Sequence, residues 1–323
     1  SDPVVSFAPN GDLYFSALVV DKDLSGLNTR NAILGSKSTD GGLSWTAPVT
    51  IDLQVPAGKG PQGEDFPLIK ADPTDPQFAY VVWRVQVQLP GSAQLRNREM
   101  FSRTTDGGRT WEPARILHDP GPGARTTGTP LIVQPDGTLI DFLTVTKRGG
   151  DPEFLLVRSS DRGQTWTPPI RIATQQPVDV TDPDNGKLVT SASPLDDVAS
   201  DPRNGNLYAV WEDGRFNGRQ HQAVAFSMST DGGLTWSKPI QINQTPTDIA
   251  PGNQQAFLPQ IHVAKDGTVG VTYYDFRFND PQPGLATDYW FVHAHPDDPG
   301  GLTNPTNWAQ ELRLTNRSFD LER

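Results

Sequence analysis

The sequence predicts an all-β protein with the architecture of a β-propeller built from four-stranded blades. Three observations lead to this prediction: an eight-residue phrase that occurs four times, a two-strand pattern before each copy, and many turn-forming residues. The 30 glycines and 30 prolines among 323 residues suit a chain with many short turns. Repetition at a period of several tens of residues is typical of propellers, in which each repeat forms one blade.

The repeated phrase reads Ser/Thr-x-Asp-x-Gly-x-Ser/Thr-Trp, and its tryptophans are separated by 66, 55 and 70 residues. Short apolar or mixed runs flank the copies, and a tight Asp-Gly turn between such runs indicates a β-hairpin. The aspartate can accept hydrogen bonds from backbone N–H groups of its own turn, and the glycine can adopt a positive φ. We therefore interpret the aspartates as structural. The copies are Ser38–Trp45, Thr104–Trp111, Ser159–Trp166 and Ser229–Trp236, with Asp40, Asp106, Asp161 and Asp231 as their aspartates.

A pair of apolar strands joined by a turn precedes each copy. Val4–Phe7 with Leu13–Leu18 is the first pair, and Pro259–Val263 with Val269–Tyr274 is the fifth. Trp308 follows the fifth pair in a degenerate copy of the phrase. Two strands before the turn and two around it make four per unit, as in a propeller blade. We expect one domain over residues 1–323, with blades at about 1–52, 63–118, 125–173, 190–243 and 253–315, both ends cut, and six blades in the full protein.

Composition narrows the classes of partner. A net charge of −11 and an isoelectric point near 4.8 argue against nucleic acid and anionic lipid. No apolar run is long enough to predict a membrane-spanning helix. Cysteine is absent, which excludes cysteine-ligated metals and thiol catalysis.

The geometry of a propeller predicts where a functional site would lie. The residues before each inner strand and those after each second strand should meet at one face, opposite the Asp-Gly turns. Acidic residues crowd the first set, and acid–arginine pairs mark the second. Trp211-Glu-Asp213-Gly-Arg215 and Tyr274-Asp275-Phe-Arg277 are two versions of one phrase in corresponding positions. One interpretation is a structural Asp–Arg bridge between blades. The other is a sugar site, in which carboxylates act as general acid and base and aromatic rings stack on sugar faces.

The repeated phrase resembles the Asp-box, or BNR repeat, of sialidases and their relatives, and this resemblance covers nearly the whole chain. It implies a six-bladed sialidase-like propeller, a glycan ligand and a location outside the cytoplasm. Sialidases also carry an Arg-Ile-Pro-type motif, an arginine triad, a Tyr–Glu nucleophile pair and an acid/base aspartate, and no Arg-Ile-Pro is present. The resemblance suggests Arg84, Arg215 and Arg277 as the triad, and Tyr273 or Tyr274 with Glu64 or Glu212 as the pair.

We therefore predict a glycan-active protein, extracellular or periplasmic, and of the glycoside hydrolase type. The rival interpretation is a non-catalytic propeller that binds carbohydrate or protein, or serves as a scaffold. No cofactor is predicted, although Asp65, Asp196 and Asp197 form a candidate calcium site. His293 and His295 lack a third metal ligand, and we interpret Asp182–Gly186 as a turn. The candidate catalytic residues are Asp65, Asp197, Glu212, Asp213, Tyr274 and Asp275, and the candidate substrate-binding residues are Arg84, Arg215, Arg277, Trp211 and Tyr273.

Overall fold

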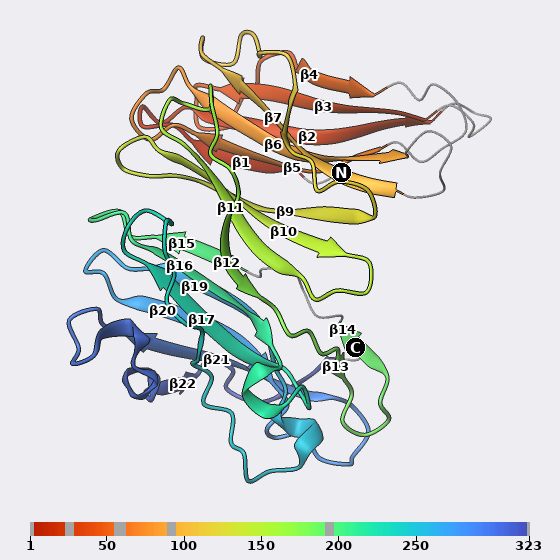
Figure 1. Cartoon of the computed structure of the whole chain (residues 1–323), viewed down its shortest axis with the longest axis vertical. Coiled ribbons are helices and arrows are strands. Elements are labelled where there is room, and N and C mark those ends of the chain that lie inside the picture. The colour runs from red at the N-terminus through yellow and green to blue at the C-terminus, as the bar shows by residue number, and fades with distance from the viewer. Residues whose placement is uncertain (1–2, 23–28, 55–62, 89–94, 191–196, 322–323) are drawn as a thin grey trace. The chain divides into compact units, whose positions relative to one another are not determined.

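A computed structural model describes residues 3–22, 29–54, 63–88, 95–190 and 197–321 (Figure 1). The chain divides into two units, each with its own apolar cores. The described residues are almost entirely strands and turns, so the prediction of an all-β protein is confirmed. The first unit comprises Ser1–Gly150 and Leu155–Pro169, and the second comprises Asp151–Phe154 and Ile170–Arg323.

The first unit begins with a four-stranded antiparallel sheet, and a larger sheet follows it. In the larger sheet, a single parallel pairing of Asn97 with Arg125 joins two antiparallel groups. The strands of the first sheet, in chain and spatial order, are β1 (Val4–Phe7), β2 (Leu13–Lys22), β3 (Thr29–Ser38) and β4 (Val49–Gln54). The larger sheet contains β5 (Gly63–Ala71), β6 (Ala79–Gln88), β7 (Leu95–Thr104), β8 (Arg115–His118), β9 (Ala124–Val133), β10 (Leu139–Lys147), β11 (Glu153–Ser159) and β12 (Ile170–Thr174).

The second unit holds two larger antiparallel sheets and a small hairpin. The 3-10 helices η1 (Arg215–Asn217), η2 (Pro251–Gln254), η3 (Gly301–Thr303) and η4 (Pro305–Trp308) lie in its connections. The strands of these sheets and of the hairpin are β13 (Val180–Thr181), β14 (Leu188–Thr190), β15 (Asp197–Ser200), β16 (Leu207–Asp213), β17 (Ala223–Ser229), β18 (Ile240–Gln241), β19 (Ala256–Val263), β20 (Val269–Asp275), β21 (Ala286–Ala294), β22 (Glu311–Arg313) and β23 (Phe319–Asp320).

Within each unit, successive sheets pack face to face. In the second unit, Tyr208 and Phe226 of the β15–β18 sheet share a core with Val271 and Val292 of the β19–β22 sheet. Trp308 is fully buried in the same core, where its ring lies 4.9 Å from that of Phe226. Burial of such rings supplies most of the stabilisation of sheets that cannot shield their apolar faces alone. This packing is consistent with neighbouring blades of a propeller.

The four repeated turns make the same hydrogen bonds, as the fourth copy illustrates. Ser229 Oγ donates to Asp231 Oδ1 over 2.8 Å and accepts from Gly233 N over 2.8 Å. Thr235 donates to Asp231 from its backbone N over 2.9 Å and from Oγ1 over 2.6 Å. The interpretation of these aspartates as structural is therefore supported by the geometry. The same four contacts hold Asp40, Asp106 and Asp161.

Two inner strands are bent by β-bulges that place a strained residue before a proline. Phe66 and Leu258 both have φ near 50°, in the left-handed region that residues with a side chain rarely adopt. The strand register shifts at both places, on β5 and on β19. Both side chains remain more than two-fifths exposed, at 53% and 42%. The bulges therefore present an apolar side chain at the end of the sheet where the site is predicted.

Candidate functional site

An open pocket of about 650 Å³ lies in the second unit, where β19 begins and β20 ends. This is the end of the sheet at which the sequence placed the candidate site. Apolar and aromatic side chains form most of the walls, and a few polar groups border them, which is the usual composition of a ligand pocket. The lining residues are Asp182, Lys187, Leu188, Val189, Thr190, Phe257, Leu258, Tyr274, Leu285, Phe319 and Leu321.

The β13–β14 hairpin forms one wall of the pocket. Its turn is closed by Asp182, whose backbone N donates to Lys187 O over 2.8 Å and whose Oδ1 accepts from Asp184 N over 2.8 Å. These bonds confirm the predicted turn. Gln255 ties the hairpin to the start of β19, because its side chain accepts from Thr181 N over 2.8 Å and donates to Thr181 O over 2.6 Å. The hairpin wall is thus fixed to the strand that carries Phe257 and Leu258.

Aromatic rings form another part of the wall. Tyr274 stacks on Tyr289 with ring centroids 4.4 Å apart and lies 5.9 Å from Phe257. Phe319 meets Tyr274 edge-on at 6.2 Å. Burial, and then the neighbouring Tyr289, raise the pKa of the Tyr274 phenol, so it stays protonated at neutral pH. The structure therefore places Tyr274, a candidate catalytic residue, at an open pocket, where its side chain is uncharged at neutral pH.

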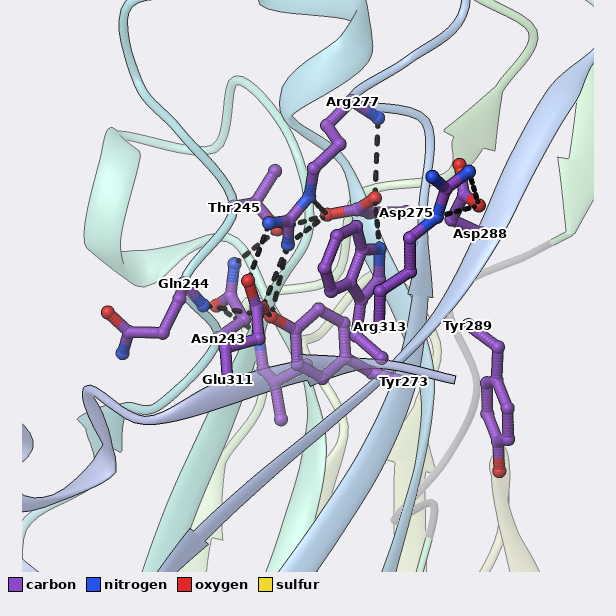
Figure 2. A network of polar contacts seen from close by, with 12 residues as sticks. Asn243, Gln244, Thr245, Tyr273, Asp275, Arg277, Asp288, Tyr289, Glu311 and Arg313 are labelled. Carbon is purple, nitrogen blue, oxygen red and sulfur yellow. Dashed lines mark hydrogen bonds and ion pairs between the residues drawn. The ribbon is translucent and has the colours of Figure 1, made fainter. Parts of the chain in front are cut away.

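Asp275 follows Tyr274 and points away into a polar network (Figure 2). Its carboxylate is fully buried and accepts hydrogen bonds from Trp290 Nε1 over 2.8 Å and Thr245 Oγ1 over 2.8 Å. Arg277 Nε donates to the same carboxylate over 2.7 Å. Although burial raises the pKa of Asp275, Arg277 and these hydrogen bonds oppose that shift. Asp275 is thus paired with an arginine of its own phrase, a local bridge rather than the predicted bridge between blades.

Tyr273 belongs to the same network. Its hydroxyl donates to Glu311 and accepts from Gln244 N, the latter over 2.9 Å. Arg277 grips Glu311 with both terminal nitrogens, at 2.6 Å and 2.9 Å. Figure 2 shows these side chains converging between the strands. Tyr273 is fully buried, and its hydroxyl is bonded to Glu311. The predicted pairing of Tyr273 or Tyr274 with Glu64 or Glu212 stays a prediction.

Asp288, at the start of β21, holds the segment that leads to the pocket. Its Oδ1 accepts from Arg313 Nε over 2.8 Å and from Thr315 Oγ1 over 2.7 Å, and its Oδ2 accepts from Ser318 Oγ over 2.8 Å. These bonds fix the chain immediately before Phe319, so the ring that closes the aromatic wall has a defined position.

The first copy of the acid–arginine phrase is also a closed structural unit. Asp213 Oδ2 accepts from Trp211 Nε1 over 2.7 Å and from Arg215 over 2.6 Å. Asp213 Oδ1 accepts from the backbone N of Arg215 over 2.9 Å, and Arg215 also donates to Thr174 O. Trp211 and Asp213 are fully buried, and the Trp211 ring packs edge-on against Phe154. The Trp211 ring therefore has no exposed face on which a sugar could stack.

Glu212, which lies between Trp211 and Asp213 in the chain, accepts a hydrogen bond from the strained bulge at Leu258. Its side chain is fully buried, and Oε1 accepts a hydrogen bond from Leu258 N over 2.8 Å. Leu258 lines the pocket and carries the left-handed backbone conformation. Glu212 thus holds a wall of the pocket in place rather than entering it.

In the first unit, Asp65 and Arg84 are opposite each other on β5 and β6. Arg84 donates to Asp65 Oδ2 over 3.0 Å, and its guanidinium lies 4.3 Å from the centre of the Phe66 ring. The Asp65 side chain is 51% exposed, whereas that of Arg84 is 11% exposed. Because Arg84 belongs to the first unit and Arg215 and Arg277 to the second, the arginine triad stays a prediction.

Asp197 lines a second hollow of about 360 Å³, beside His262 and Thr272. Its two oxygens accept from Val198 N over 2.9 Å and Ile261 N over 3.0 Å. Burial raises the pKa of this carboxyl, and the two backbone hydrogen bonds only partly offset it. A carboxyl with a raised pKa beside an open hollow has the chemistry of a general acid.

The described residues hold no cluster of three or more His, Asp or Glu side chains arranged to bind a metal ion. The calcium prediction involves Asp196, which lies outside the described residues, and it joins Asp65 of one unit to Asp197 of the other, so it stays a prediction. Among the described residues, no helix is long and apolar enough to cross a membrane.

Sequence reasoning missed several residues that build the site. Glu311 and Trp290 complete the Asp275 network, and Asp288 positions the segment before Phe319. None lies in a repeated phrase, so no pattern singled them out. The hairpin wall was visible only as a turn at Asp182–Gly186.

Comparison with known proteins was made by sequence and by structure. No family model matches the sequence. A xyloglucanase from a Paenibacillus species is 26% identical over 230 residues, which cover 70% of this chain and 20% of that protein. A sialidase from Micromonospora viridifaciens is 27% identical over 182 residues, or 51% of this chain and 28% of that protein. The chain thus spans between 20% and 28% of the length of these relatives.

Several structural neighbours are sialidases or trans-sialidases. A Hadza microbial sialidase matches with a TM-score of 0.55 and 19% identity, covering 98% of this chain and 58% of that one. An intramolecular trans-sialidase from Ruminococcus gnavus matches with a TM-score of 0.55 and 13% identity, covering 99% and 86%. At these identities the structures establish the fold. Together with the two sequence relatives they support a sialidase-like superfamily, without identifying a particular member.

Proposed function

We propose that this chain is a glycan-binding part of a glycoside hydrolase-type protein and that the sugar binds in the pocket lined by Tyr274. The observation that carries the proposal is the composition of that pocket. It has a volume of about 650 Å³, aromatic walls from Phe257, Tyr274 and Phe319, and polar groups at its border. Aromatic rings can cover the apolar faces of a pyranose while polar groups reach its hydroxyls. The names of the relatives, a xyloglucanase and a sialidase, agree with a glycan as ligand.

Hydrolysis by this chain is the second candidate function, and Asp197 favours it. Asp197 combines a raised pKa with a place in an open hollow. Asp213 and Asp275 are poorer candidates, because each carboxylate is fully buried and already bonded to an arginine and an indole. Glycosidic hydrolysis needs two carboxyl groups that flank the bond, so this candidate function requires a second carboxyl group beside Asp197.

The rest of the sequence-based hypothesis is retained as a proposal. We propose five four-stranded blades within these residues and six in the complete propeller, and a protein that works outside the cytoplasm. The four-stranded sheets β1–β4 and β15–β18, and the face-to-face packing within each unit, support the blades.

The test is to measure sugar binding by calorimetry with Tyr274→Ala. We expect roughly a tenfold or greater loss of affinity for soluble neutral and sialylated oligosaccharides that wild-type protein binds, because a stacking ring is removed from the centre of the pocket. Phe7→Ala is the matched control, since Phe7 is an aromatic residue of the first unit with 68% exposure. Equal affinity of Tyr274→Ala and wild type would refute the proposed pocket. Release of reducing ends from the bound sugar by wild-type protein would establish hydrolysis.

A further inference from the structure

We infer that the pocket lined by Tyr274 selects uncharged sugars over sugars that carry a carboxylate. The inference rests on the proposed function and specifies its substrate class. Two observations support it. Arg277, Arg215 and Arg313 are bonded to carboxylates of the protein, and the charged residues that line the pocket offset each other.

Arg277, the arginine closest in sequence to Tyr274, forms its hydrogen bonds with carboxylates of the protein. It donates from Nε to Asp275 over 2.7 Å and from its two terminal nitrogens to Glu311 over 2.6 Å and 2.9 Å. Its guanidinium lies 3.6 Å from the centre of the Trp290 ring, and its side chain is only 7% exposed. Turning this arginine toward a ligand would leave the fully buried Asp275 without its counter-charge, which is strongly unfavourable.

Arg215 and Arg313 are similarly engaged. Arg215 donates to Asp213 over 2.6 Å and also to Thr174 O. Arg313 donates to Asp288 over 2.8 Å from Nε and 2.6 Å from a terminal nitrogen. A planar guanidinium fork is the protein group that best matches a ligand carboxylate, because it forms two parallel hydrogen bonds. Arg277, Arg215 and Arg313 therefore all direct their guanidinium groups to protein carboxylates.

The pocket wall offers no substitute. Among the described residues that line it, Lys187 is the single cation and Asp182 is the single anion, so their charges offset each other. A lone ammonium is a point charge without the geometry to hold a carboxylate by two bonds. The remaining walls are apolar or hydroxylic, which suits a neutral pyranose. A net charge of −11 further disfavours approach of an anionic glycan.

Arg317 is the nearest alternative anchor for an acidic sugar. It lines a separate hollow that shares Phe319 with the pocket, and Asp320 lines the same hollow. An acidic residue beside the arginine makes this hollow mixed in charge. Arg317 and Lys187 are thus the two positions at which the inference can be challenged by substitution.

The experiment compares matched sugars on the wild-type chain by calorimetry. The probes are a neutral gluco-oligosaccharide, the same oligosaccharide oxidised at its terminal C6 to the uronic acid, and 3′-sialyllactose. We expect the neutral probe to bind roughly tenfold or more tightly than either acidic probe. We also expect its affinity to be unchanged by added sodium chloride and by Arg317→Ala, because no ion pair contributes to it.

Tighter or equal binding of an acidic probe would overturn the inference, and loss of that binding in Lys187→Ala or Arg317→Ala would identify the anchor. The proposed function would survive that result, since a glycan would still bind at the Tyr274 pocket. Failure of all three probes to bind, in contrast, would count against the proposed function itself and against the substrate class with it.

Discussion

In three copies of the repeated turn, the residue after the aspartate is a glycine, but in the third copy it is Arg162. All four residues have a positive φ, and that of Arg162 is 58°. A residue with a Cβ in this region costs about 1 kcal/mol or more relative to glycine. Arg162 offsets the cost through contacts that glycine lacks. Its guanidinium lies 3.1 Å from Asp75 and 4.1 Å from the centre of the Phe78 ring.

This balance predicts different outcomes for two substitutions of Arg162. Arg162→Ala removes the contacts and keeps the strained backbone, whereas Arg162→Gly removes both. We expect the alanine variant to have the lower free energy of unfolding, by about 1 kcal/mol relative to the glycine variant. Urea unfolding at neutral pH measures the difference. If alanine were as stable as glycine, the positive φ would carry no cost in this turn.

At the scale of elements, the strands follow from local patterns that the sequence displays. β1 spans the predicted Val4–Phe7, and β20 extends the predicted Val269–Tyr274 by one residue. The repeated turns were predictable because Ser, Asp and Gly satisfy one another within eight residues. The walls of the pocket were not, because they come from a hairpin, two strands and the segment around Phe319, which contact one another only after folding.

The acid–arginine phrase is a second case in which the sequence pattern alone does not define the contacts of the residues. Its residue types fit both a structural bridge and a sugar site, and only the partners distinguish them. Those partners include Trp290 and Glu311, which are distant in sequence and belong to no repeat. Bulges at Phe66 and Leu258 were likewise unexpected, since a residue before proline normally favours extended backbone.

The bulge at Leu258 yields a prediction about Glu212. Glu212→Ala leaves the Leu258 N–H without its acceptor inside the protein and should lower the free energy of unfolding by about 1–3 kcal/mol. Glu212→Gln, the matched control, keeps an oxygen that can accept the bond and should cost less. Because Leu258 lines the pocket, the alanine variant should also weaken sugar binding. Urea unfolding and calorimetry of both variants test this, and equal effects would show that the hydrogen bond does not hold the wall.

At the scale of the whole molecule, two sets of carboxyl groups give stability opposite dependences on pH. Asp40 and Asp161 have a pKa of about 2, chiefly because Ser44 and Thr165 donate to them. Their contribution is present above the unfolded pKa and is lost as the pH falls toward 2. Burial raises the pKa of Glu99 and Asp141 well above the usual range, and for Glu99 the Asp141 charge adds to the effect while Arg84 opposes it.

Glu99 and Asp141 lie beyond one end of an apolar layer in the first unit. Phe101 and Leu139 share a core. Glu99 lies two residues before Phe101 on β7, and Asp141 lies two residues after Leu139 on β10. Both carboxyls are buried, and among the described residues neither oxygen of Asp141 has a hydrogen-bond partner. A group with a raised folded-state pKa stabilises the fold below its unfolded pKa, and that contribution is lost as the pH rises through the folded value. Stability should therefore decline as the pH rises from about 4 toward and beyond neutrality.

The combined variant Glu99→Gln, Asp141→Asn tests this account, because it removes two groups that resist ionisation while keeping similar shape. We expect it to unfold at higher urea concentration than wild type above neutral pH and at nearly the same concentration near pH 4. Asp197 and Asp275, whose pKa values are also raised by burial, should leave part of the decline in place. Asp248→Asn is the control, since it removes an exposed carboxylate. An unchanged pH profile in the combined variant would mean that these two carboxyls are already compensated in the folded protein, and the alkaline decline would then need another origin.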